Sequence, residues 1–261
     1  MNTVRQLFLI AKGVWLEAIR RRDIYVIVAL GCLLIVALAR IRFFGLDSLS
    51  KFYRETALTL MSMATALTVI VLAARQLPRE FSARTIYPLL ARPVRRATFL
   101  VGKLLGVVGA GAFCLTLFLC IYALGCLGMD VPVFPALLVQ HALLQVCMLS
   151  VLASLCFLLS IVSNLDAAVT FGLLFYAAST GFSNLLQLLY HESSAFAQTV
   201  IQGLTWVLPQ LMVFDLSEKN VHGEVWPPLS AGVMGQLILY ALLYTGAYLL
   251  FTGVLFRRKP L

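Results

Sequence analysis

The residue pair best suited to do chemistry in this sequence is Glu80 and Arg84, which stand in a Glu-x-x-x-Arg pattern. A glutamate in such a setting could act as a general base and activate water if histidines supported it. The three histidines are His141, His191 and His222. The last two fall in a loop that the topology below places across the membrane from Glu80. The arrangement therefore does not favour a hydrolytic site.

Other catalytic and metal-binding patterns are also weak. The Glu-x-x-x-Arg pattern resembles the glutamate motif of intramembrane CAAX-type proteases, so such a protease is the alternative from the enzyme class. The His-Glu pair at 191–192 lacks the second histidine of zinc hydrolases, and no Gly-x-Ser-x-Gly elbow occurs. The six cysteines form no Cys-x-x-Cys pair, and the three within 99–127 point in three directions around a helix. We predict no catalytic residue and no metal site on this chain.

Composition indicates an integral membrane protein. Hydrophobic residues make up 61% of the chain and charged residues 12%, whereas soluble domains average about 25% charged residues. A membrane helix needs about 20 apolar residues, and six stretches meet that need: 24–44, 56–74, 99–127, 134–162, 167–190 and 229–256. The alternating ten-residue strands of a barrel are lacking. The sequence predicts one all-α membrane domain over 1–261 with six transmembrane helices.

Residues 1–23 precede the first predicted span and have the pattern of an amphipathic helix. Charged and polar residues occupy one face, and apolar residues recur at three- and four-residue spacing on the other. The apolar positions are Val4, Leu7, Phe8, Ala11, Val14, Trp15 and Ala18. We expect this helix to lie along the membrane surface. The alternative is that it is only the start of the first span.

The basic residues predict the orientation of the chain. With six spans and the N-terminus inside, fifteen of the twenty Lys and Arg residues fall on the cytoplasmic side and five on the other side. Positive charge is retained on the cytoplasmic side, so both termini are predicted to be cytoplasmic. The net charge of +9 is concentrated next to the spans, which favours contact with lipid headgroups over binding of nucleic acid.

The segment between the second and third predicted spans is the most informative. Residues 75–103, which extend into the third predicted span, carry seven Lys and Arg residues, one carboxylate and three prolines. The residues Glu80, Thr85-Ile86, Leu89-Leu90-Ala91, Pro93-Val94, Arg96 and Gly102-Lys103, directly before an apolar span, resemble the signature of permease subunits of type-two ABC transporters. Within that family they resemble the NosY-like and gliding-motility permeases. Arg84 departs from the pattern, because the family more often has glycine there.

The resemblance implies a type-two ABC exporter-like permease of six spans, located in the bacterial cytoplasmic (inner) membrane. It works with a second permease copy or a related permease. A separate ABC ATPase would bind a short cytoplasmic coupling helix within 75–98. The candidate coupling residues are Arg79, Glu80, Arg84, Thr85, Leu89, Leu90, Pro93 and Arg96. Pro78 and Pro93 are expected to supply helix ends.

The chain itself has no Gly-x-x-x-x-Gly-Lys-Ser/Thr loop for nucleotide phosphates. ATP and magnesium are therefore expected on the partner subunit, and no cofactor is expected on this chain. A membrane scaffold that uses the ATPase to transmit force is the alternative that is not an enzyme.

Two further features concern packing and the outer side. Gly102, Gly106 and Ala110 repeat small residues at four-residue spacing, which predicts a face for close helix packing. The outer loop 191–228 has apolar residues at helical spacing followed by Pro209. In type-two permeases this region resembles the re-entrant helices that close the outer mouth; the alternative is an interfacial helix with no role in gating.

Overall fold

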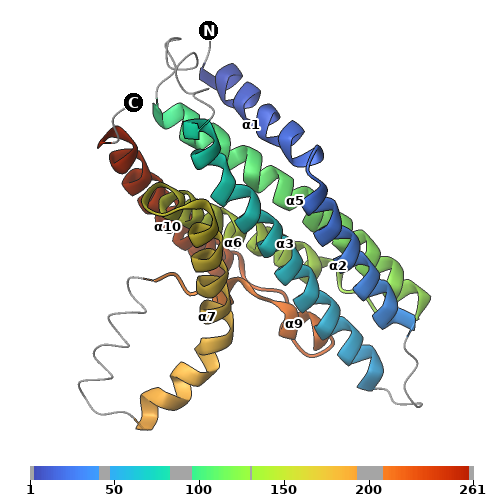
Figure 1. Cartoon of the computed structure of the whole chain (residues 1–261). Helices are drawn as coiled ribbons and strands as arrows, with labels where there is room; N and C mark the ends of the chain where they lie inside the picture. Colours follow the sequence, from blue (N-terminus) through green and yellow to red (C-terminus); the bar gives the residue numbers. More distant parts are fainter. Residues whose placement is uncertain (1–2, 41–47, 83–95, 130, 193–207, 259–261) are drawn as a thin grey trace.

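The chain folds into a bundle of helices (Figure 1), and the computed structural model describes all residues except 1–2, 41–47, 83–95, 130, 193–207 and 259–261. No strand occurs among the described residues. In lipid each backbone amide must be satisfied within its own segment, so apolar runs of this length form helices. The elements are α1 (Thr3–Ile19), α2 (Arg22–Arg40), α3 (Ser48–Ser82), α5 (Arg96–Gly128), α6 (Pro135–Val162), α7 (Leu165–Glu192), η1 (Leu211–Phe214), α9 (Ser217–Val221) and α10 (Ala231–Arg258).

The start of α1, the end of α3, the start of α5 and the end of α10 lie together at one end of the bundle, which is uppermost in Figure 1. We call this the proximal end and the other the distal end. The distal end carries the end of α2, the start of α3, the α5–α6 connection, η1 and α9. Both flanks of 83–95 therefore lie at the end that also carries both chain termini.

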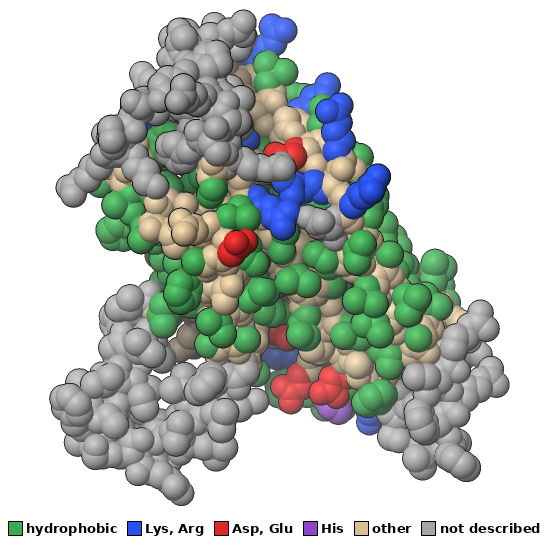
Figure 2. Space-filling model, viewed as in Figure 1, with side chains coloured by type: hydrophobic (Ala, Val, Ile, Leu, Met, Phe, Trp, Pro, Cys, Tyr) green, Lys and Arg blue, Asp and Glu red, His purple; other side chains and the backbone are tan. Residues whose placement is uncertain are grey.

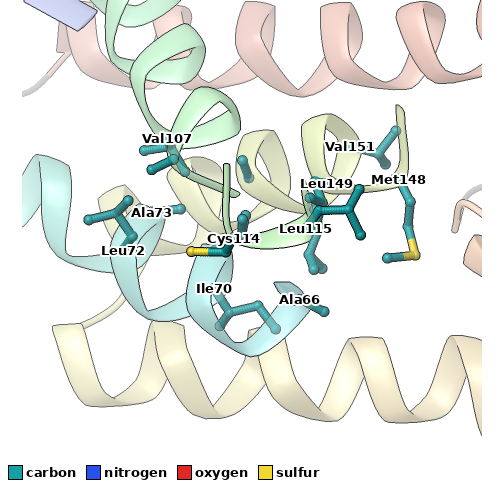
Figure 3. Close-up of a cluster of buried hydrophobic side chains, with 14 of the residues drawn as sticks. Ala66, Ile70, Leu72, Ala73, Val107, Cys114, Leu115, Met148, Leu149 and Val151 are labelled. Carbon is teal, nitrogen blue, oxygen red and sulfur yellow. The ribbon is translucent and has the colours of Figure 1, made fainter. Parts of the chain in front are cut away.

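The core of the bundle lies between α3, α5 and α6. Figure 3 shows side chains from these three helices meeting in one cluster: Ala66, Ile70, Leu72 and Ala73 from α3, Val107, Cys114 and Leu115 from α5, and Met148, Leu149 and Val151 from α6. Gly111 faces both α3 and α6, since a Cβ there would lie 2.5 Å from Val69 and 3.2 Å from Leu149. The absence of a side chain at this position lets the three helices approach closely.

Four helical stretches among the described residues are long and apolar enough to cross a membrane: Lys51–Pro78, Arg96–Gly128, Pro135–Val162 and Ala231–Phe256. The shorter apolar helices Ile24–Leu38 and Leu165–Thr180 correspond to the first and fifth predicted spans. The all-helical membrane architecture is confirmed in this coarse form. The count of six spans stays a prediction.

Helix α3 is longer than the predicted span at 56–74, because it begins at Ser48 and continues to Ser82. Pro78 lies inside this helix, so the expectation that it ends a helix is wrong. Proline removes one backbone hydrogen bond from a helix interior. Just before it, Gln76 and Leu77 are almost completely buried, and this packing holds the chain helical past the proline.

Helices α1 and α2 follow each other along α5 and run in the same direction as α5 (Figure 1). Contacts with α1 involve the first part of α5, where Gly102 faces Ile10. Contacts with α2 lie further along α5, where Phe118 faces Gly31. α1 thus packs lengthwise on the bundle through its apolar face, with Val14 fully buried. The placement of this helix at a membrane surface stays a prediction.

Candidate functional site

A chain of polar side chains joins α1, α3 and α5 at the proximal end. The Lys103 ammonium donates to Oε1 of Gln76 at 2.8 Å, and Nε2 of Gln76 donates to Oε2 of Glu17 at 3.2 Å. Arg21, which directly precedes α2, donates to Oε1 of Glu17 at 3.4 Å. We call Glu17, Arg21, Gln76 and Lys103 the anchor network. Lys103 can only donate, so Gln76 must present its oxygen to Lys103 and its amide nitrogen to Glu17.

The anchor network is largely removed from solvent at its centre. Gln76 is 1% exposed and Lys103 is 7% exposed. The Lys103 ammonium also lies 5.6 Å from the centre of the Phe99 ring, a distance at which a cation is attracted to an aromatic face. Hydrogen bonds to charged groups in such surroundings are stronger than those at a surface. The network therefore ties the end of α3 firmly to α1 and α5.

A second contact ties the start of α5 to the end of α10. Arg96, the first residue of α5, donates to the carbonyl oxygen of Phe256 at 3.3 Å. Its guanidinium lies 5.6 Å from the centre of the Phe256 ring, which in turn stacks on Phe99 at 6.4 Å. We call Arg96, Phe99 and Phe256 the Arg96 clamp. Arg96 thus has partners within the chain itself.

The remaining candidate coupling residues are described in part or not at all. The backbone of Arg79 and Glu80 belongs to the last turns of α3, but their side chains lie outside the described residues. The other candidates, Arg84, Thr85, Leu89, Leu90 and Pro93, all lie outside the described residues. The two flanks of this segment, in contrast, are both fixed to the bundle, one by the anchor network and the other by the Arg96 clamp.

Charge is distributed unevenly over the surface (Figure 2). The largest group of Lys and Arg side chains on the visible face lies toward the proximal end, and hydrophobic side chains cover the middle of the molecule. This pattern agrees with an apolar belt in the membrane and a basic end beside it. The proximal end is therefore suited to contact acidic headgroups or an acidic protein surface.

The small residues of α5 lie against α1. A Cβ at Gly102 would stand 3.0 Å from Ile10, and one at Gly106 would stand 2.6 Å from Val14 and 2.9 Å from the Ala11 carbonyl oxygen. Ala110, the third residue of the predicted packing face, is 6% exposed. The close approach of α1 depends on the two glycines. The sequence pattern indicated a packing face but did not identify α1 as the partner.

At the distal end, His141 holds the segment that follows Pro209. Its side chain is fully buried, and Nδ1 accepts a hydrogen bond from the Leu216 N–H at 3.3 Å. Nδ1 also lies 3.9 Å from Oδ1 of Asp215, which itself accepts hydrogen bonds from the backbone and hydroxyl of Ser217. His141 therefore acts here as an acceptor that fixes a loop.

Two other helices hold the same distal segment. The Ser179 hydroxyl on α7 accepts from the Leu211 N–H at 2.7 Å and donates to the Pro209 carbonyl at 3.1 Å. The Tyr240 hydroxyl on α10 accepts from the Gln210 N–H at 3.0 Å. Side chains of α6, α7 and α10 thus fix 209–216 across this end of the bundle.

The geometry does not support a site for peptide hydrolysis. Residue 80 belongs to the proximal end of α3, whereas His141 contacts the distal segment. The end of α3 and the segment around η1 lie at opposite ends of the bundle (Figure 1). Among the described residues, no group of three His, Cys, Asp or Glu side chains could hold a metal ion.

Sequence reasoning missed most of the contacts described above. The anchor network joins residues 59 and 27 positions apart, the Arg96 clamp joins residues 160 positions apart, and the His141 contact spans 75 positions. Gln76 and Lys103 carried one usable signal, because each is a polar residue at the edge of a long apolar run. Such residues are frequently paired with one another.

Comparison with known proteins agrees with the architecture. No curated protein matches the chain. A family model described as "ABC-2 family transporter protein" matches residues 10–261. The matched region includes the anchor network, the Arg96 clamp and the distal segment. The chain, a helical membrane protein by the evidence above, therefore belongs to the ABC-2 family of transporter proteins, the family of ABC transporter permeases.

Proposed function

We propose that the chain is the membrane-spanning subunit of an ATP-driven exporter whose ATPase is a separate protein docked on 79–96. Membership of the ABC-2 family supports the transport role. The sequence lacks a nucleotide-binding loop, so energy must come from a partner. The substrate would cross by alternating access between this chain and a second permease copy or a related permease.

The observation that carries this proposal is the fixing of both flanks of 83–95. Gln76 links the end of α3 to α1 and α5, and Arg96 links the start of α5 to α10. A displacement of the intervening segment by a bound ATPase would act on these four helices together. Helices that are tied to each other move as a unit when one is pushed.

The distal segment completes the proposed cycle. The hydrogen bonds that His141, Ser179 and Tyr240 accept from backbone N–H groups hold 209–216 at the distal end. We infer that this segment closes the outer mouth in the state described here. Opening would require breaking these bonds, with energy supplied from the proximal end.

The docking proposal is tested by placing charge in the predicted apolar contact. Leu89→Asp combined with Leu90→Asp should leave the chain inserted but reduce co-purification of the ATPase and abolish substrate-stimulated ATP hydrolysis. Loss of an apolar interface anchor typically costs about 2 kcal/mol or more. Val225→Asp is the matched control, because residue 225 is exposed at the distal end. Full ATPase binding and coupled hydrolysis in the double variant would refute the docking site.

Orientation is tested by labelling single introduced cysteines in a cysteine-free chain. Positions 84 and 258 should react only from the cytoplasm and position 219 only from outside. Reaction of position 84 from outside would overturn both the inner-membrane topology and the docking site. If the ATPase binds yet no solute crosses, the scaffold role replaces transport. The finer resemblance to NosY-like permeases stays a prediction.

A further inference from the structure

Arg54 is a buried cation near the distal end of α3. It lies three residues inside the candidate span that begins at Lys51, and its side chain is only 2% exposed. Its Nε and Nη1 atoms have no hydrogen-bond partner among the described residues. A buried guanidinium without an acceptor is strongly unfavourable. The position therefore calls for an anion.

Tyr53, the residue next to Arg54 in the sequence, provides a second buried hydrogen-bond donor. Tyr53 is 2% exposed, and its hydroxyl also lacks a hydrogen-bond partner among the described residues. Its ring stacks on Tyr122 with centroids 6.0 Å apart and an interplanar angle of 7°. Arg54 and the Tyr53 hydroxyl are thus two buried donors, adjacent in the sequence, that lack an acceptor among the described residues.

The helix backbone is adapted to this cluster. A Cβ at position 125 would overlap the Tyr53 hydroxyl, so Gly125 lets that hydroxyl lie against α5. Nearby carboxylates do not neutralise Arg54 in the described part of the chain: no ion pair joins it to Glu55 on its own helix or to Glu218 on α9, which packs against α3. Asp130 is outside the described residues, and the experiment below treats it separately.

We propose that Arg54 and Tyr53 form a binding site for a phosphate group, supplied by a phospholipid headgroup or by a free phosphate compound. The planar guanidinium presents parallel N–H groups that match two oxygens of one phosphate. The depth fits a headgroup, because Arg54 lies within one turn of the end of a candidate span. This site does not depend on the ATPase docking proposed above.

The test uses the full chain, freed of lipid in a maltoside detergent that contains no phosphate. Phosphatidylglycerol and inorganic phosphate are titrated separately, and thermal unfolding is followed. Wild-type protein should be stabilised in a saturable manner, and Arg54→Gln should weaken the apparent affinity about tenfold or more, since a bond to a charged group is lost. Lys51→Gln is the matched control, because it removes a charge from an exposed side chain one turn earlier. A response to the lipid alone identifies a headgroup site, and a response to inorganic phosphate identifies a site for free phosphate.

Two further variants keep the proposal falsifiable if Arg54→Gln fails to fold. Tyr53→Phe removes only a hydroxyl. Without a ligand, loss of an unpartnered buried hydroxyl should be neutral or stabilising; with a bound phosphate it should weaken the response severalfold. Equal responses of wild type, Arg54→Gln and Tyr53→Phe would overturn the site. A second result would also overturn the site: wild type responds to neither phosphate probe, and Asp130→Asn is destabilised as much as Arg54→Gln. Arg54 would then pair with Asp130 within the chain.

Discussion

Replacement of Gln76 by leucine removes the central side chain of the anchor network. The side chain that replaces it is apolar and of similar size. The Lys103 ammonium would lose its 2.8 Å bond to Oε1, and Glu17 would lose its 3.2 Å bond from Nε2. Leucine is a good helix former, so α3 itself should persist. The effect should therefore report on the contacts between helices.

The expected magnitude follows from the burial of the two partners. A hydrogen bond to a charged group contributes about 1.5–3 kcal/mol, and Lys103, at 7% exposure, should show a loss near the top of that range. The Glu17 side chain is 29% exposed, so water replaces part of its lost bond and the cost there is about 1 kcal/mol or less. Together we expect a loss of about 3 kcal/mol, or a melting temperature about 6–12 °C lower.

Thermal unfolding of purified protein measures the stability, and ATP hydrolysis with the partner ATPase measures coupling. If the network fixes one flank of 83–95, Gln76→Leu should retain ATPase binding but lose most of the stimulation of hydrolysis by substrate. Gln236→Leu is the matched control, because this glutamine on α10 is exposed. That variant should behave as wild type in both assays.

A double-mutant cycle separates the network from a local packing effect. Glu17→Ala and Gln76→Leu should together cost less than the sum of the single variants, by about 0.5–1 kcal/mol, because both remove the same bond. Additive losses would show that the two side chains act independently. Unchanged stability in Gln76→Leu would refute the reasoning about the anchor network altogether.

Two further substitutions test the packing of α1 and the distal segment. Gly106→Ala should lower the free energy of unfolding by about 1–3 kcal/mol, because its Cβ would lie 2.6 Å from Val14. Gly109→Ala is the control and should leave stability unchanged, since a Cβ there would meet nothing within 4 Å. Equal stability of the two variants would contradict the close approach of α1 to α5. His141→Leu leaves a backbone N–H of the distal segment without its acceptor, a loss of about 1–3 kcal/mol. Limited proteolysis should then cut that segment faster than in the exposed-site control His222→Leu, and equal rates would contradict the fixing role.

The sequence predicted the helical membrane class because apolar length is a direct consequence of bilayer thickness. It also located the basic segment whose flanks the structure fixes. It failed at Pro78, where burial of Gln76 and Leu77 outweighs the loss of one backbone bond. Proline marks a helix end only when no packing holds the chain beyond it.

Local sequence patterns could not predict the individual contacts between helices. Arg96 was expected to face a partner protein, yet its hydrogen bond is to Phe256 at the other end of the chain; whether it also contacts an ATPase stays a prediction. Arg54 falls in the loop between the predicted spans 24–44 and 56–74, two residues before the second of them. In the structure it is a buried residue of α3. Periodicity identifies which face of a helix is apolar, but it contains no information on which distant helix covers that face.

The packing of α1 along α5 has a consequence for biogenesis. Val14 of α1 faces Gly106 of α5, so the ribosome releases the first helix long before the helix that covers it. During that interval the apolar side of α1 can bind the membrane surface, because its amphipathic pattern is typical of interfacial helices. We expect α1 to bind the lipid surface first. Its apolar side would then leave the lipid and pack on α5 once α5, the third predicted span, has been inserted. The two glycines of α5 that face α1 would then help to decide when the N-terminus leaves the lipid surface.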